Sequence, residues 1–231
     1  TWFALRRPTI GPGRAALAGF LGASCLVTEY QSAVYLVPLV VVALARVRPR
    51  VASLAAALAG AALPLVALGL YHQAAFGSPL KTGYNFIANP YFAKVHAQGF
   101  MGVSHPRWVN LVGSLFLPSK GLLFWCPFLV LGFAGLVSYA RRMARSEAVL
   151  RTLMVALPML FVTSMVYWDG GWTVGQRHLT PMVPFLMAPA GLLLDRSRAA
   201  RLAGPALAAV SVLLTGLATV VYPHLPEHIP N

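Results

Sequence analysis

The chain has 231 residues, of which 58% are hydrophobic and 10% are charged, and its mean hydropathy is +0.70. This composition excludes a soluble globular domain and indicates an integral membrane protein. The formal net charge of +13 does not indicate nucleic-acid binding, because the basic residues stand in short clusters between apolar runs and there orient a protein in the bilayer.

The apolar runs predict an all-α polytopic transmembrane helical bundle with about seven spans. The first run, residues 15–45, is too long for a single helix across a hydrocarbon core about 30 Å thick. It therefore predicts a hairpin of two shorter helices that folds back at residues 28–31, and the arginines at its end would return to the side where it began. The other predicted spans are residues 51–71, 121–140, 147–168, 181–194 and 204–222.

These spans divide the chain into four predicted regions. Residues 1–71 hold the hairpin and the third span, residues 72–120 form an extracytoplasmic or interfacial loop region, residues 121–222 form a four-span bundle, and residues 223–231 are an outer tail. The chain begins without a methionine, inside a basic segment that is typical of a helix end. We therefore expect it to be the C-terminal part of a longer protein.

The basic residues are distributed unequally between the two faces of the predicted bundle. Thirteen arginines flank the spans on one face, and five basic residues fall on the other. By the positive-inside rule the first face is cytoplasmic. The second face also receives all six histidines and Asp169, so we expect a functional site there, on the extracytoplasmic side of a bacterial inner membrane. The five basic residues of that face are Lys81, Lys94, Arg107, Lys120 and Arg177.

A polar loop at residues 167–178 joins two apolar runs and concentrates glycines, aromatic residues and charge. Glycines let the backbone approach a ligand closely, and Arg177 offers a planar fork of donors to a phosphate. Tryptophans also anchor simple turns at the membrane interface, but anchoring alone requires neither the glycines nor the arginine. We interpret the loop as one wall of a site for an anionic lipid-linked substrate. Its candidate binding residues are Trp168, Gly170, Gly171, Trp172, Arg177 and His178.

Three further positions have both a functional and a structural interpretation. Glu29, at the tip of the first hairpin, faces either a functional cavity or plain solvent. Lys120, in the segment PSKG, would meet a second anionic group or simply snorkel at a helix end. Asp169 is a fallback general base or metal ligand, although an aspartate beside glycine is more commonly a turn residue. The histidines lack the close spacing of metal ligands. The only argument for a divalent metal is therefore that all of them fall on the same face.

Several motifs together resemble those of a known family. The sequence reads YWDGGWTVGQRHL at residues 167–179, FGSP at 76–79, KTGY at 81–84 and PSKGLL at 118–123. With the helix-turn-helix around LVTEY at 26–30, these motifs resemble bacterial multi-spanning glycosyltransferases of the GT-C type, similar to the dolichyl-phosphate-mannose protein mannosyltransferase and family 39 group. The resemblance covers nearly all of the chain. It departs at Glu29, where the family commonly has lysine, and in lacking a counterpart of the family's catalytic aspartate.

The resemblance implies a membrane glycosyltransferase of the cell envelope that uses a polyprenyl-phosphate-linked sugar donor. Arg177 would grip the donor phosphate with Lys120 as a second cation, Tyr84 and the two loop tryptophans would shape the sugar or acceptor pocket, and the catalytic acid would lie upstream of this chain. The sequence does not identify the acceptor. A transporter or flippase of lipid-linked sugars and a non-catalytic assembly subunit are the alternatives. A transporter needs polar residues at mid-depth, and the spans after residue 121 carry almost none.

Overall fold

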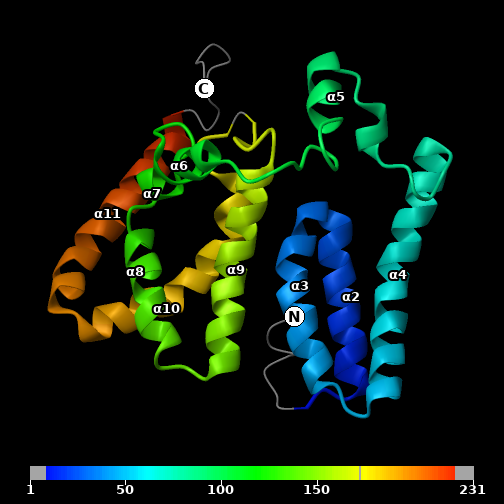
Figure 1. Ribbon diagram of the computed structural model, residues 1–231, viewed down its shortest axis with the longest axis horizontal. Coiled ribbons are helices and arrows are strands. Elements are labelled where there is room, and N and C mark those ends of the chain that lie inside the picture. The colour runs from blue at the N-terminus through cyan, green and yellow to red at the C-terminus, as the bar shows by residue number, and fades with distance from the viewer. Residues whose placement is uncertain (1–8, 172, 222–231) are drawn as a thin grey trace. The chain divides into compact units, whose positions relative to one another are not determined.

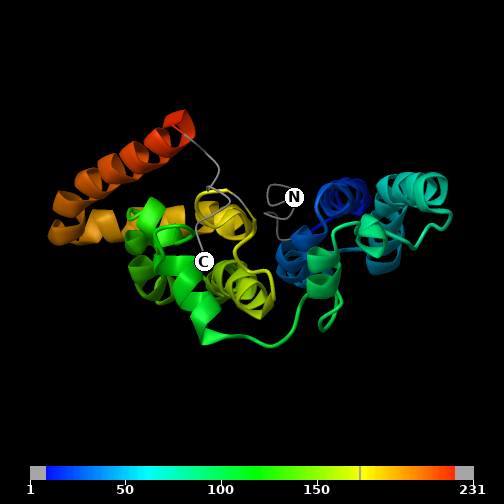
Figure 2. The same cartoon turned by 90° about the horizontal axis from the view of Figure 1, so that it is seen from above.

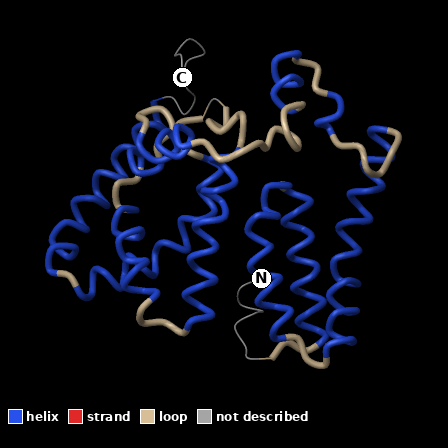
Figure 3. The backbone as a smooth tube through the Cα atoms, in the orientation of Figure 1, coloured by secondary structure: helices blue, strands red, loops and turns tan. Residues whose placement is uncertain are grey.

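The computed structural model describes residues 9–171 and 173–221, and the regular secondary structure within these ranges is helical (Figure 1, Figure 3). Strand-like pairing among the described residues is limited to isolated bridges such as that between Ile10 and Val47. The all-α prediction is therefore confirmed for this part of the chain. The predictions made for Trp172 and for the tail at residues 223–231 fall outside the described residues.

Three of the described helices are long enough and apolar enough to cross a membrane, by length and composition: α4, α9 and α11, with 27, 20 and 24 residues. Each overlaps one of the predicted spans. The elements in chain order are α2 (Pro12–Thr28), η1 (Tyr30–Ser32), α3 (Ala33–Arg46), α4 (Arg50–Phe76), η2 (Gly83–Phe86), α5 (Pro90–His96), α6 (Trp108–Phe116), α7 (Leu122–Trp125), α8 (Leu129–Ala140), α9 (Arg145–Ser164), η3 (Arg177–Met182), α10 (Val183–Arg196) and α11 (Arg198–Val221).

The chain divides into two compact units, Thr1–Lys94 and Val95–Asn231, and the division falls inside the predicted loop region at residues 72–120. In the first unit, α2, α3 and α4 form one cluster, coloured blue to cyan in Figure 2. The expected break in the first apolar run is present, because α2 ends at Thr28 and α3 begins at Ala33. The amide of Ile10 donates to the Arg46 carbonyl over 3.0 Å, which joins the start of α2 to the end of α3 as a hairpin requires.

Helices α2 and α4 approach each other through small residues. A Cβ atom placed on Gly19 would overlap the backbone of Ala57, and one placed on Gly60 would overlap the backbone of Ala16. Small residues at such contacts let helix backbones come close, which is the usual way that apolar helices associate in a membrane. The α2–α4 contact therefore depends on these two glycines.

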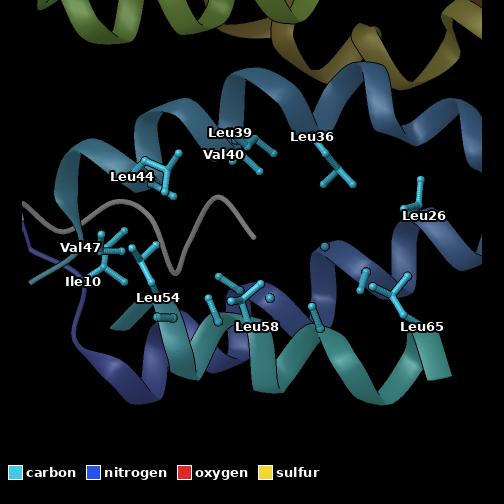
Figure 4. Close-up of a pocket in the computed structure, with 18 residues that line it drawn as sticks. Ile10, Leu26, Leu36, Leu39, Val40, Leu44, Val47, Leu54, Leu58 and Leu65 are labelled. Atoms are coloured by element: carbon cyan, nitrogen blue, oxygen red, sulfur yellow. The ribbon is translucent and has the colours of Figure 1, made fainter. Parts of the chain in front are cut away.

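An apolar cavity of about 470 Å³ lies between α2, α3 and α4 (Figure 4). Figure 4 shows Leu36 and Leu39 of α3 on one side of the cavity and Leu54 and Leu58 of α4 on the other. All of the side chains that line it are aliphatic, apart from two glycines. The cavity offers no side chain that can hydrogen-bond to a phosphate, so it does not match the anionic site that the sequence predicts.

In the second unit the predicted span at residues 121–140 is interrupted. The short helix α7 ends at Trp125, and α8 begins only at Leu129. Pro127 explains the break, because a proline disfavours helical geometry in the residue before it, and Cys126 accordingly has φ −134° and ψ 71°. Ser211 of α11 stabilises the break by accepting a hydrogen bond of 3.1 Å from the amide of Phe128.

Helices α8 and α10 also pack through glycines. A Cβ atom on Gly132 would lie 2.7 Å from the Cβ of Leu186, and one on Gly135 would overlap the carbonyl group of Pro189. By contrast, a Cβ atom on Gly191 of α10 would meet no atom within 4 Å. An alanine side chain therefore fits at position 191 but not at position 135.

We expect Gly135→Ala to destabilise the protein by about 1–3 kcal/mol, because the added methyl group forces α8 away from α10. The matched variant Gly191→Ala should be neutral or stabilising by up to about 1 kcal/mol, because alanine favours a helix over glycine. Thermal unfolding in lipid nanodiscs measures both. Equal melting temperatures for the two variants would contradict this account of the α8–α10 contact.

Candidate functional site

The loop between α9 and η3 is held from inside the protein by a buried lysine. Lys120 is only 1% exposed. Its ammonium group donates to the carbonyl oxygens of Gly171 and Thr173, the latter over 2.8 Å. Lys120 therefore supports the backbone of the loop, and in this position it does not face a ligand as the predicted second phosphate contact would.

The environment of Lys120 lowers the pKa of its ammonium group. Burial is the main cause, the positive charge of Arg177 adds to the lowering, and the negative charge of Asp169 opposes it. A desolvated ammonium group needs hydrogen-bond acceptors to remain charged. The two loop carbonyls supply them, so the lysine and the loop stabilise each other.

A tight turn between α6 and α7 places Lys120 under the loop. The carbonyl of Leu117 accepts from the amides of both Lys120, at 3.2 Å, and Gly121, at 2.5 Å. A Cβ atom on Gly121 would lie 2.6 Å from the carbonyl carbon of Phe116, so this position of the turn requires glycine. The loop returns the contact through the amide of Gly175, which donates to the Ser119 carbonyl over 3.1 Å.

Gln176 joins the two ends of the loop to α6. It is 2% exposed, and its side-chain Nε2 donates to the carbonyl of Trp168 over 2.8 Å and to the hydroxyl of Ser114 over 3.2 Å. Buried Asn110, one turn earlier on α6, donates to the carbonyl of Met165 over 3.0 Å. These amide side chains satisfy loop carbonyls that no helix or strand can satisfy.

The glycines of the loop are required by its backbone. Gly170, Gly171 and Gly175 have φ values of 70°, 87° and 72°, in the left-handed region that L side chains rarely adopt. Space is also limited, because a Cβ atom on Gly170 would lie 2.9 Å from the imidazole ring of His178 and 3.3 Å from Cγ of Arg177. The glycines thus let the loop backbone run directly against the two side chains that carry its polar chemistry.

Arg177 and His178 differ in charge and exposure. Arg177 is exposed, whereas His178 is half-buried. Burial, together with the charges of Arg177 and Lys120, lowers the pKa of His178 to about 4. The ring is therefore neutral at physiological pH, and Arg177 is the cation that the loop presents to solvent.

A cavity of about 340 Å³ lies beside the loop, bounded by α7, the start of α10 and the last turns of α11. Arg177, Thr173 and Gln176 line it from the loop side, and Thr215 and Thr219 line it from α11. Unlike the aliphatic cavity of the first unit, this one combines hydroxyl, amide and guanidinium groups with an apolar floor. It is the cavity whose chemistry fits the site predicted from the sequence.

The structure gathers most of the predicted binding residues around this loop. Gly170, Gly171, Arg177 and His178 contact one another there, and Lys120 lies beneath them. The indole of Trp168 packs on α6, where a Cβ atom on Gly113 would overlap the ring.

Asp169 and the two residues of the first unit have local structural positions. Asp169 is 8% exposed, and its Oδ1 accepts a hydrogen bond of 3.4 Å from the amide of Gly171, as an aspartate in a turn does. Glu29 is exposed at the junction of α2 and η1. Tyr84 is 42% exposed, and its ring centroid lies 6.3 Å from that of Tyr30.

Trp125, Thr173 and Gln176 contribute to the site but were not predicted from the sequence as binding residues. The sequence signal for Thr173 and Gln176 is that they are hydrogen-bonding residues within the glycine-rich loop, whereas Trp125 stands in an apolar run and has no such signal. In the described residues, no three histidine, cysteine, aspartate or glutamate side chains lie close enough together to hold a metal ion. We therefore derive no step through a divalent metal.

Comparisons with protein-family models, curated proteins and solved structures found no match to this chain. The functional interpretation consequently depends on the residues of the loop, on their geometry and on the motif resemblance stated above.

We expect Lys120→Met to lower the free energy of unfolding by at least about 1–3 kcal/mol, because the carbonyls of Gly171 and Thr173 would lose their buried donor. Thermal unfolding in nanodiscs measures the loss, and amide hydrogen exchange at residues 169–176 should accelerate. The control Lys94→Met removes an exposed lysine and should change stability by less than about 0.5 kcal/mol. Unchanged exchange in the loop of Lys120→Met would rule out its supporting role.

His178 should make the protein less stable in acid. The folded protein resists protonation of this ring until about pH 4, whereas the unfolded chain takes up the proton near the ordinary value of 6.5. Stability is therefore lost as the pH falls from about 6.5 and levels off near about 4. His178→Gln should flatten this part of the melting-temperature profile, while His105→Gln, at an exposed site, should leave it unchanged. An identical slope in His178→Gln and the wild type would contradict the prediction.

Proposed function

We propose that the chain is part of a membrane glycosyltransferase that takes a sugar from a polyprenyl-phosphate-linked donor on the extracytoplasmic face of a bacterial inner membrane. One observation carries the proposal. The exposed guanidinium of Arg177 borders a polar cavity whose other wall is α11, a helix of membrane-spanning length with little of its surface buried in the chain. A lipid-linked donor can place its hydrocarbon chain along such a helix and its phosphate at the arginine.

The charge arrangement of the loop supports an anionic ligand at Arg177. Guanidinium groups bind phosphate oxygens through paired hydrogen bonds. Lys120 lies below the loop and His178 is neutral, so Arg177 is the positive group available at the loop surface. The glycines at positions 170 and 171 leave its side chain room beside the backbone. We therefore assign Arg177 to the donor phosphate and Lys120 to the positioning of the loop.

We do not assign the role of catalytic base in the proposed reaction to Asp169. A general base must reach the hydroxyl from which it takes the proton, whereas Asp169 is buried and accepts from the amide of its own turn. The role that we propose for the loop is donor binding, and the catalytic aspartate of the family that the chain resembles has no counterpart among the described residues.

Arg177→Ala tests the phosphate assignment. In nanodiscs it should weaken binding of farnesyl-phosphate-linked mannose, glucose or arabinose by about ten- to a hundredfold, the usual effect of losing hydrogen bonds to a charged group. kcat/KM for the same donors should fall in parallel. The control Arg198→Ala removes an exposed arginine at the other end of α11, about 25 Å along the helix from Thr215, and should leave binding unchanged.

The same experiment separates the proposed transferase from its alternatives. Unchanged donor binding in Arg177→Ala would reject the phosphate assignment. Movement of the donor across proteoliposomes without covalent transfer of its sugar would favour a transporter. The protein would be an assembly subunit if it bound neither the donor nor free polyprenyl phosphate and co-purified with an intact glycosyltransferase.

A further inference from the structure

We infer that the cavity beside the loop is the pocket for a single sugar ring, which Trp125 and Thr173 hold together with Gln176. This inference rests on the proposed function and adds to it the residues that recognise the sugar. The phosphate assignment concerns Arg177 at the border of the cavity, and the sugar assignment concerns its wall.

Three residues of this wall have unmet hydrogen-bonding capacity. The indole Nε1 of Trp125, the hydroxyl of Thr173 and the amide Oε1 of Gln176 are buried and have no hydrogen-bond partner. The orientation of the Gln176 amide is set by its Nε2, which donates to the Trp168 carbonyl. A buried polar group without a partner destabilises the folded state, so three of them around one cavity require a physical reason.

The unmet groups are of different kinds. Trp125 can only donate, the Gln176 oxygen can only accept, and the Thr173 hydroxyl can do both. On α11, the hydroxyls of Thr215 and Thr219 donate to backbone carbonyls of their own helix and keep lone pairs for a ligand. A ligand hydroxyl both donates and accepts, so a compound with several neighbouring hydroxyls matches this mixture of groups.

The described wall of the cavity away from Arg177 carries no charge, which suits an uncharged ring. Among its described lining residues, Arg177 is the only one with a formal charge. The volume of about 340 Å³ is at the small end of the range for ligand pockets, which suits one ring and not an oligosaccharide. Much of the remaining lining is apolar, and Trp125 contributes an aromatic ring to it. One monosaccharide with its anionic end at Arg177 satisfies all of these conditions.

The loop can bring the unmet groups to such a ligand. In this conformation the three atoms are closed off from solvent. A Cβ atom on Gly175 would lie 3.6 Å from Cδ1 of Trp125, so the glycine-rich loop packs directly on the indole. Binding of a ring requires a small shift of Thr173 that keeps its carbonyl bonded to Lys120, and the glycines at positions 171 and 175 have the backbone freedom for it.

The test compares ligands that differ only in the sugar. Farnesyl methyl phosphate, a diester with the same single negative charge, and farnesyl phosphate linked to mannose, glucose or arabinose are titrated against the full chain in lipid nanodiscs. At least one sugar-bearing ligand should bind about tenfold more tightly than the methyl diester. We define this ratio as the sugar increment. A wild-type protein that binds all four ligands equally would overturn the inference.

Two variants remove the unmet groups. Thr173→Val keeps the shape of the wall, whereas Trp125→Phe removes the Nε1–H donor together with part of the ring system. Trp125→Phe and Thr173→Val should each reduce the sugar increment about three- to tenfold and leave the affinity for the methyl diester unchanged. The melting temperature of Thr173→Val should stay the same or rise, since an unpaired polar atom is replaced by an apolar one. That of Trp125→Phe should fall, because the smaller ring leaves space behind. The control Thr152→Val lies on an exposed part of α9 and should change neither quantity.

The outcomes separate this inference from the proposed function. Arg177→Ala should weaken binding of all four ligands and preserve the sugar increment. If it does not weaken binding, the phosphate assignment fails. If Trp125→Phe and Thr173→Val both keep the wild-type increment, the sugar pocket fails even where the phosphate assignment holds.

Discussion

The hydrogen bonds from the buried Lys120 ammonium group to the carbonyls of Gly171 and Thr173 determine where the loop of the second unit lies. Removing a charged group from water is unfavourable unless hydrogen bonds replace its hydration. The loop carbonyls belong to a backbone with left-handed glycines, so they lack the regular partners of a helix or a strand. The lysine and the loop therefore satisfy each other, and neither arrangement would be stable alone.

The cavity follows from this contact and from a break in the neighbouring helix. Pro127 ends α7 after one turn, and Ser211 of α11 accepts from the Phe128 amide that follows the break. This bond ties the start of α8 to α11 on one side, while Lys120 ties the loop to the start of α7 on the other. The space left between the loop, α7 and α11 is the polar cavity. A continuous helix through residues 121–140 would have had no such corner.

Local patterns in the sequence predicted the helical class, the three longest apolar helices and the break after Thr28, because each of these depends on apolar length or on a short polar interruption. The polar loop was also recognisable, since its glycines and charged residues are rare in an apolar chain. The burial of Lys120 was not predictable. A lysine at a helix end can snorkel to the surface or turn inward, and only the distant carbonyls of the loop decide between the two. The same limit applies to Trp125 and Gln176, whose importance comes from unmet hydrogen bonds around a cavity formed by distant segments.

Comparison of two cavities among the described residues shows why chemistry identifies a site better than volume does. The larger cavity, between α2, α3 and α4, is lined by aliphatic side chains and glycine and can hold only hydrocarbon. The smaller one has an arginine, several hydroxyls and an amide within a helical frame that is otherwise apolar. Polar groups are costly to keep in such surroundings unless they meet a partner. Helix α11 carries Thr215 and Thr219 into this cavity and leaves most of its apolar surface outside. In the function that we propose, this arrangement would let a lipid-linked ligand reach the polar groups while its hydrocarbon chain stays beside the apolar helix.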